Sequence, residues 1–289
     1  WFELMAAFAI PSRVADALRS ATLQLSGDDA RREAEILLGA VLQRGRTWLF
    51  AHADAVLSET ELARFNALLQ QRIEGRPVAY LLGHREFFGL DLRVSAETLI
   101  PRADTETLVE HALHLLHGRS GLRVLDLGTG SGAIALALAR HLPESEVWAT
   151  DRSESALQVA QENARQLGIH NVRFFAGDWW SALSPDAAKF DLIASNPPYI
   201  DANDPHLRQG DLRFEPRSAL VADEQGLADL RRIIASAAVH LRPGGWLLLE
   251  HGWQQSEDVQ NLLSTAGAQA IATLVDLGGQ PRVSLGRWF

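Results

Sequence analysis

One short segment of the chain combines a side-chain amide, two prolines and an aromatic ring: Asn196, Pro197, Pro198 and Tyr199. An amide nitrogen is a poor nucleophile because its lone pair is delocalised into the carbonyl, so it needs acceptors that hold both of its hydrogens. The Asn196 side-chain oxygen can be one acceptor and the Pro197 carbonyl the other, while Tyr199 offers a flat ring for stacking. The segment therefore predicts chemistry at a planar amide or amine nitrogen. Asn196, Pro197 and Tyr199 are the predicted catalytic residues, and all four residues are predicted to hold the substrate.

The position of this segment agrees with such a role. It follows an apolar run at residues 190–195, and open α/β folds bind their ligands at the carboxyl ends of their strands. Proline donates no hydrogen bond and restricts φ, and a residue before proline is held in extended geometry. We therefore expect a rigid backbone whose carbonyls are available as acceptors.

A second segment, at residues 128–132, is rich in glycine and follows the apolar run 124–127. Glycine is needed where the backbone approaches a ligand or takes positive φ. Asp151 ends the next apolar run, where a carboxylate can hold a ribose diol. The glycine spacing also satisfies the loose dinucleotide fingerprint, so this segment alone leaves the cofactor open.

A third segment, Gly177, Asp178 and Trp179, narrows the choice of cofactor. It follows the third apolar run, where an acidic side chain can take an adenine amine and an aromatic ring can lie beside the base. Acids after the second and third strands fit an adenosyl ligand that lacks a pyrophosphate. The predicted cofactor-binding residues are Gly128, Thr129, Gly130, Ser131, Gly132, Asp151, Asp178, Trp179 and Asn196.

The elements that position these segments alternate between apolar runs and helical periods. Strands are expected at residues 123–127, 147–150, 172–176, 190–195 and 246–250, and helices at 133–141, 154–167 and 227–241. This alternation predicts an α/β fold with a mostly parallel, doubly wound, Rossmann-like sheet. The last two apolar runs, at 270–277 and 283–289, predict an antiparallel hairpin at the sheet edge.

The first part of the chain has a different pattern. Apolar residues recur at helical spacing up to residue 73, and residues 86–94 alternate around a glycine as a short hairpin does. We expect a helical domain at residues 1–83, a β-hairpin linker at 84–100 and the sheet domain at 101–289.

Composition limits the possible partners. The net charge of −9 counts against a nucleic-acid enzyme without excluding one, because phosphate contacts need a basic face. The absence of cysteine excludes disulfides and thiolate metal sites and suits a reducing cytoplasm. We expect no metal and no membrane contact, since the apolar runs are too short for a span. Met5 is the only methionine, so residues 1–4 are expected to precede the natural start.

The Asn-Pro-Pro-Tyr segment resembles the signature of methyltransferases that act on exocyclic or amide nitrogens. Further stretches resemble the bacterial release factor glutamine methyltransferase family, so that the resemblance covers nearly the whole chain. They lie at residues 75–83, 86–90, 99–106, 126–133, 177–179 and 195–200. Ala103 departs from the family, which usually has a second proline there. Residues 222–224 replace a stretch that is richer in glycine, so the local loop geometry is open.

The resemblance implies a class I methyltransferase domain behind a helical domain that docks a peptide chain release factor. It implies S-adenosylmethionine as cofactor, S-adenosylhomocysteine as product, and the glutamine of a Gly-Gly-Gln motif as substrate. Residues 128–132, Asp151 and Trp179 would then contact the cofactor, and residues 196–199 would hold the glutamine.

Three other functions remain as alternatives. A related family methylates a ribosomal protein on glutamine, but lacks the Asp-Thr-Glu run found here at residues 104–106. A DNA adenine methyltransferase would need to flip its base and grip phosphates, and the charge is unfavourable for that. An adaptor that merely uses the fold would not need the Asn-Pro-Pro-Tyr set.

Two features are expected to do no chemistry. The chain has its own Gly278-Gly279-Gln280, which we interpret as a hairpin turn and not as a self-methylation site. His111, His114 and His117 lie three apart on a helical stretch, whereas helical zinc sites prefer ligands four apart, so a structural role is expected.

Overall fold

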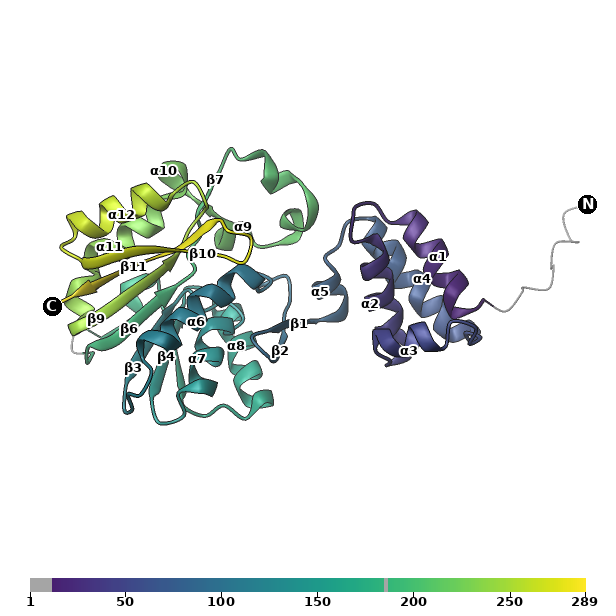
Figure 1. Cartoon of the computed structure of the whole chain (residues 1–289), viewed down its shortest axis with the longest axis horizontal. Helices are drawn as coiled ribbons and strands as arrows, with labels where there is room; N and C mark the ends of the chain where they lie inside the picture. The colour runs from purple at the N-terminus through teal and green to yellow at the C-terminus, as the bar shows by residue number, and fades with distance from the viewer. Residues whose placement is uncertain (1–11, 185–186) are drawn as a thin grey trace, which may run out of the picture. The chain divides into compact units, whose positions relative to one another are not determined.

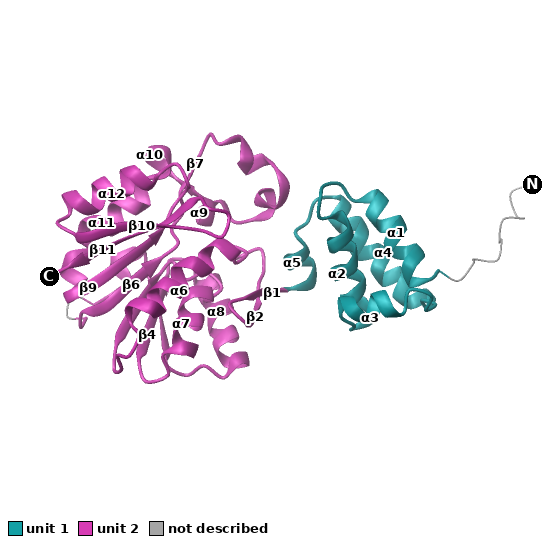
Figure 2. Cartoon of the chain, in the orientation of Figure 1, with its two compact units in different colours: residues 1–83 teal, residues 84–289 magenta. Residues whose placement is uncertain are grey.

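The structure is a computed structural model that describes residues 12–184 and 187–289. Met5 and the predicted natural start lie outside the described residues. The chain forms two compact units, one up to Gly83 and the other from His84 (Figure 2). Within the described residues, no helix is both long enough and apolar enough to cross a membrane.

The first unit is a bundle of short amphipathic helices with its own apolar core, in which Leu37, Leu38 and Phe65 are buried. Ser58 begins the longest helix with a reciprocal cap, because its hydroxyl accepts from the Glu61 N–H while the Glu61 carboxylate accepts from the Ser58 N–H. The helices are α1 (Val14–Gln24), α2 (Ala30–Leu42), α3 (Arg46–Ala51), α4 (Glu59–Ile73) and α5 (Val78–Leu82).

The second unit is built on a seven-stranded sheet with the order β10-β11-β9-β6-β3-β4-β5. The five strands from β9 to β5 run parallel, while β11 pairs antiparallel with both β9 and β10. The strands are β3 (Arg123–Leu127), β4 (Glu146–Asp151), β5 (Val172–Ala176), β6 (Phe190–Ser195), β9 (Leu241–Glu250), β10 (Gln269–Val275) and β11 (Pro281–Trp288). The predicted Rossmann-like fold with an antiparallel C-terminal hairpin is confirmed.

Helices cover both faces of this sheet, as Figure 1 shows. Successive strand side chains point to opposite faces, so Val124 joins the core under one helical layer and Leu125 the core under the other. One layer holds α6 (Glu106–Leu115), α7 (Ala133–His141) and α8 (Glu154–Leu167); the other holds α11 (Ala228–His240) and α12 (Ser256–Thr265).

The remaining elements are short and lie between the strands and these helices. They are β1 (His84–Phe87), β2 (Leu90–Arg93), β7 (Ile200–Asp201), β8 (Val221–Ala222), α9 (Arg217–Leu220), α10 (Asp223–Gly226), and the 3₁₀ helices η1 (Ala103–Thr105), η2 (Trp179–Ala182), η3 (Pro205–Arg208) and η4 (Gly210–Phe214).

The β1–β2 hairpin is part of the second unit. Phe88 and Gly89 both have positive φ, as a tight hairpin turn requires. The side chain of Asn163 on α8 bridges this hairpin to the glycine-rich segment, since it donates to the carbonyls of Arg93 and Ser131 at 3.0 and 2.8 Å. The hairpin therefore braces the predicted cofactor site.

The chain's own Gly-Gly-Gln forms the turn between β10 and β11. Asp276 organises it: its N–H donates to the Gln280 carbonyl, and its carboxylate accepts from the Gln280 N–H, both at 2.9 Å. These backbone bonds agree with the interpretation of residues 278–280 as a hairpin turn.

Candidate active site

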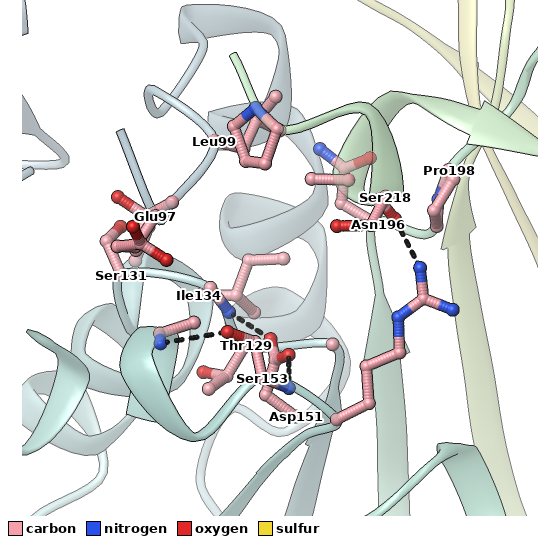
Figure 3. A pocket seen from close by; sticks show the side chains of 18 of the residues that line it. Glu97, Leu99, Thr129, Ser131, Ile134, Asp151, Ser153, Asn196, Pro198 and Ser218 are labelled. Atoms are coloured by element: carbon pink, nitrogen blue, oxygen red, sulfur yellow. Dashed lines mark hydrogen bonds between the residues drawn. The ribbon is translucent and has the colours of Figure 1, made fainter. Parts of the chain in front are cut away.

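A pocket of about 940 Å³, with its open mouth included, lies where β3, β4 and β6 end. This is a normal size for a site that binds a small molecule. Figure 3 shows Asp151, Thr129 and Ser153 close together in it, while Asn196 and Pro198 stand apart from them. Among the predicted residues, those that line this larger pocket are Gly128, Thr129, Gly130, Ser131, Asp151, Asp178, Trp179, Asn196 and Pro198.

A smaller hollow of about 350 Å³ adjoins the larger pocket and shares Asn196 with it. Pro197, Tyr199 and the apolar Leu212 line this smaller hollow and not the larger pocket, whereas Leu99 lines both. Asn196 is thus the predicted catalytic residue that borders both spaces.

The glycine-rich segment needs glycine for two different reasons. Gly128 has φ +75°, and a Cβ there would lie 3.1 Å from the Trp179 ring. Gly132 lines neither space; it has φ +88° and permits α7 to pack closely, since a Cβ would lie 3.2 Å from that of Ala160 on α8. The segment is anchored to β4 because the Thr150 carbonyl accepts from the N–H groups of Gly128 and Thr129.

Asp126, on β3, holds the glycine-rich segment and the start of α7 by hydrogen bonds. It is fully buried, and one carboxylate oxygen accepts from the Thr129 hydroxyl at 2.6 Å and from the Ala135 N–H at 3.1 Å. Its other oxygen, Oδ1, has no hydrogen-bond partner within the described part of the chain. Burial raises the pKa of Asp126 to about 7, although both hydrogen bonds oppose the shift.

Asp151 lies at the end of β4 with both carboxylate oxygens directed by the backbone. Oδ2 accepts from the Gly130 N–H and Oδ1 from the Ser153 N–H, each at 2.9 Å. Each oxygen has a second lone pair, so the carboxylate is held in place and can still accept two hydroxyls. This arrangement suits the predicted ribose diol.

Replacing Asp151 with alanine is expected to weaken S-adenosylmethionine binding by at least about tenfold, because charge-assisted hydrogen bonds contribute roughly 1.5–3 kcal/mol each. Loss of the bond to the Gly130 N–H should loosen the glycine-rich segment as well. Titration calorimetry measures the affinity. Asp204→Ala is the matched control, since this exposed carboxylate also accepts a backbone N–H, that of His206, but lies outside the pocket. An unchanged affinity for Asp151→Ala would remove this residue from the site.

Trp179 and Asp178 have tertiary partners that the sequence did not predict. Trp179 has a left-handed φ of 51°, and its indole N–H donates to Asp229 on α11 at 2.9 Å. Its ring therefore supports Gly128 as well as lining the pocket. The Asp178 carboxylate pairs with Arg232 at 2.6 Å, so this group is held by α11.

Asn196 is one end of a hydrogen-bonded network that runs through Thr105 and Glu250 to Tyr199. Its Nδ2 lies 3.2 Å from the Thr105 hydroxyl, which in turn lies 2.6 Å from Glu250 Oε2. The Tyr199 hydroxyl lies 3.2 Å from the other oxygen, Glu250 Oε1. Burial, followed by the nearby Glu250, raises the pKa of Tyr199, so the phenol is neutral.

The backbone of Tyr199 is held from the other side by Gln255 and Gly226. Gln255 Nε2 donates to the carbonyls of Tyr199 and Gln225, both at 3.1 Å. Gly226 has φ +84°, and a Cβ there would collide with the Tyr199 carbonyl oxygen. Before it, Glu224 and Gln225 also have positive φ. Glu224, the last residue of the stretch that departs from the family's glycine-rich pattern, therefore takes a left-handed conformation without being glycine.

Gly226→Ala is expected to lower the free energy of unfolding more than a left-handed glycine elsewhere would. Alanine in the left-handed region costs roughly 1–2 kcal/mol, and forcing a methyl group into packed atoms adds about 1–3 kcal/mol. Gly279→Ala is the control, because its φ is +78° and nothing lies within 4 Å of the added Cβ. Equal losses for the two variants in urea unfolding would show that the contact with Tyr199 does not matter.

Arg102 lines both the larger pocket and the smaller hollow, and the buried carboxylate of Glu215 holds it in place. Glu215 pairs with Arg102, and it accepts from the Ile100 N–H at 3.0 Å. Burial raises the pKa of Glu215 despite these bonds. The contact ties the segment before α9 to the segment before η1.

Sequence reasoning missed several of these residues as site residues. In the sequence, Thr105 stands out only as part of a stretch that resembles the family, and Glu250 only as the last residue of a predicted strand. A usable signal existed for Glu250, since an acid at the carboxyl end of a buried parallel strand lies at the ligand-binding edge.

Two of the three histidines on the predicted helical stretch lie close together on α6. The rings of His111 and His114 on α6 have centroids 5.8 Å apart, and burial lowers the pKa of His111. Within residues 12–184 and 187–289, no group of three or more acidic, histidine or cysteine side chains could hold a metal ion.

Comparisons with known proteins agree with this architecture. A family model described as a methyltransferase domain matches residues 119–277, and one described as the PrmC N-terminal domain matches residues 16–83. A solved methyltransferase from Pyrococcus furiosus shares the fold, with a TM-score of 0.53 and 20% identity over 75% of this chain and 96% of its own.

Curated relatives are more similar in sequence. The release factor glutamine methyltransferase of Xylella fastidiosa is 54% identical, over 89% of this chain and 93% of its own length. The enzyme of the same name from Escherichia coli is 50% identical, over 94% of this chain and 98% of its own length. With such identity over nearly the whole of each protein, the chain belongs to the release factor glutamine methyltransferase family.

Proposed function

We propose that the chain transfers a methyl group from S-adenosylmethionine to the side-chain amide nitrogen of the glutamine in the Gly-Gly-Gln motif of peptide chain release factors. The observation that carries this proposal is the place of Asn196 between the larger pocket and the smaller hollow. A methyl donor in one space and a glutamine side chain in the other would meet at this residue. The relatives' shared name supports the choice of substrate.

The larger pocket fits an adenosyl sulfonium better than a pyrophosphate. Three carboxylates line it, and while Asp178 is paired with Arg232, Glu97 and Asp151 accept from a hydroxyl and from backbone N–H groups and so keep their negative charge without a cationic partner among the described residues. Its two arginines are engaged elsewhere, Arg102 with Glu215 and Arg152 with the Ser218 carbonyl. Acidic walls favour a cation and disfavour phosphates. When bound, S-adenosylmethionine would supply the electrophilic methyl group and leave as S-adenosylhomocysteine.

The chain's own residues would make the amide nitrogen reactive. Asn196 Oδ1 and the Pro197 carbonyl would accept the two amide hydrogens, which turns the nitrogen lone pair away from both residues. The same acceptors stabilise positive charge that develops on the nitrogen as the methyl group arrives, which is stabilisation specific to the transition state. The methylated nitrogen then loses one of its two hydrogens as a proton to water, which restores a neutral amide. The Tyr199 ring would support the planar amide in the smaller hollow.

The helical unit is proposed to dock the release factor, and residues 84–289 to carry the chemistry. Each unit has a separate apolar core, and every predicted cofactor residue lies in the second. The proposed substrate acts in translation, so the reaction would take place in the cytoplasm.

A panel of acceptors tests the proposed substrate. The chain is incubated with S-adenosylmethionine labelled in its methyl group and, separately, with purified release factor, a ribosomal protein substrate of the related family, and duplex DNA. We expect label on the release factor alone. Label on the ribosomal protein or on DNA, with none on the release factor, would contradict the proposal.

A further inference from the structure

We propose that Thr105 and Glu250 are positioning residues that set the orientation of the Asn196 side-chain amide and of the Tyr199 phenol. This inference rests on the proposed function, since it explains how Asn196 comes to present an acceptor to the substrate. Thr105 lies at the end of η1, Glu250 at the end of β9 and Asn196 directly after β6. The three residues are brought together only by the fold.

The direction of each hydrogen bond follows from the chemistry of the groups. An ionised carboxylate can only accept, so the Thr105 hydroxyl must donate its one hydrogen to Glu250 Oε2, 2.6 Å away. That hydroxyl can then only accept from Asn196, 3.2 Å away, so the Asn196 atom facing it must be the N–H₂ group. The Asn196 oxygen is thereby left to accept from the substrate.

The same carboxylate orients Tyr199. The phenol lies 3.2 Å from Glu250 Oε1 and must donate to it. One oxygen of this carboxylate therefore holds Tyr199 directly, and the other holds Asn196 through the Thr105 hydroxyl. Thr105 is 4% exposed and Glu250 1% exposed, so water is a poor substitute for either partner. A buried network of this kind holds its members in one arrangement when every bond is made.

Charged side chains on two neighbouring elements change the pKa of Glu250. Arg282 on β11 favours the carboxylate, and Asp104 on η1 disfavours it. Arg282 itself pairs with Asp276 at 3.1 Å. Burial is the largest influence and raises the pKa of Glu250 to about 7, against the hydrogen bonds from Thr105 and Tyr199.

A pH dependence follows from this position. Above about pH 7 Glu250 is ionised and accepts from both hydroxyls. Below about pH 7 Glu250 is protonated and must donate one hydrogen bond. Either Thr105 or Tyr199 then loses its acceptor, and the directions of the hydrogen bonds to Asn196 are no longer fixed. The turnover number of the wild type should therefore fall as the pH drops below about 7. In Glu250→Gln it should be low and lack this dependence, because the amide does not titrate.

Two threonine substitutions test the chain of bonds without altering the fold. Thr105→Val keeps the shape and removes the hydroxyl, and should lower the single-turnover rate by at least about tenfold, the effect of roughly 1.4 kcal/mol. Thr105→Ser keeps the hydroxyl and should restore most of the rate. Cofactor affinity should stay unchanged in both. Thr273→Val is the control, since this half-buried hydroxyl bonds Gln260 and Ser284 away from the pocket.

Asp191→Asn is the matched control for Glu250→Gln. Asp191 is also buried and holds Arg119 and Arg242, but it stands near the amino end of β6, opposite the site. It should lower thermal stability without changing the pH profile of turnover. A similar loss of pH dependence in Asp191→Asn would show that the effect of Glu250→Gln is merely structural.

The double variant Thr105→Val with Asn196→Ala is decisive. If Thr105 acts through Asn196, the double variant should be no slower than Asn196→Ala alone. If the rate of the double variant instead falls by the product of the two single losses, the inference is overturned. A wild-type rate for Thr105→Val would overturn it as well.

A measurement without substrate separates this inference from the proposed function. The NMR signals of the Asn196 side-chain N–H₂ should shift in Thr105→Val and stay in place in Thr273→Val. If the wild type fails to methylate release factor, the proposed function fails while this result still decides the inference. Unshifted Asn196 signals would overturn the inference whatever the substrate is.

Discussion

Replacing Asn196 with alanine is expected to lower the rate of methyl transfer to release factor by at least about 10²–10³-fold while cofactor affinity stays near that of the wild type. The estimate follows the loss of one preorganised donor from an oxyanion hole. The Asn196 oxygen is proposed to stabilise charge that appears only as the methyl group arrives, and such contacts affect turnover more than binding. Single-turnover kinetics measure the rate, and calorimetry measures the affinity.

Two further substitutions sharpen this prediction. Asn196→Asp keeps an acceptor oxygen, but its second oxygen would face the Thr105 hydroxyl, whose hydrogen is directed to Glu250. We therefore expect a rate between those of the wild type and Asn196→Ala. Tyr199→Ala tests the competing view that the ring is the main element. Near-normal rates for Asn196→Ala together with a collapse for Tyr199→Ala would contradict the proposed acceptor.

Removing residues 1–83 is expected to reduce kcat/KM for whole release factor by about 10²-fold or more, the scale of gain that a linked second binding surface provides. Cofactor affinity should change little. The remaining residues contain the whole seven-stranded sheet, both of its apolar cores and the larger pocket, so this part has the elements needed to fold.

Two controls accompany this truncation. Thermal unfolding of residues 84–289 establishes that the sheet unit is folded, and a short Gly-Gly-Gln peptide reports on the chemistry without docking. The loss should be large for the release factor and small for the peptide. Equal rates of the full and shortened chains on whole release factor would show that the helical unit does not dock it.

Much of the fold could be predicted because strong periodicity marks buried elements. The bounds of β3, β5, β6, α7 and α8 agree with the predicted ones, since each is a run of apolar or amphipathic residues between glycine or polar breaks. β9 begins at Leu241, before the expected start at residue 246, because Leu241 pairs with Phe190 on β6 and the pairing with β6 resumes at Trp246 after a register shift. Gly244 has positive φ within this irregular part of the strand, so an apolar pattern alone does not predict it.

The predicted site could be located but not fully built from the sequence. Asn196, Asp151 and the glycine-rich segment come to one pocket because their strands end at the same sheet edge. The roles of Thr105 and Glu250 could not be predicted, because these residues are 145 positions apart in the sequence. Their hydrogen bond also depends on where the fold directs the two side chains. The second role of Trp179 was equally hidden, since its left-handed backbone and its bond to Asp229 arise from tertiary packing.

The most direct test of the proposed reaction is to locate the transferred methyl group. Release factor methylated by the full chain is digested, and tandem mass spectrometry assigns the modified residue and atom type. We predict one methyl group on the side-chain amide of the Gly-Gly-Gln glutamine, and none on a release factor in which that glutamine is replaced by asparagine. Methylation at any other residue, or undiminished methylation of the asparagine variant, would contradict the account.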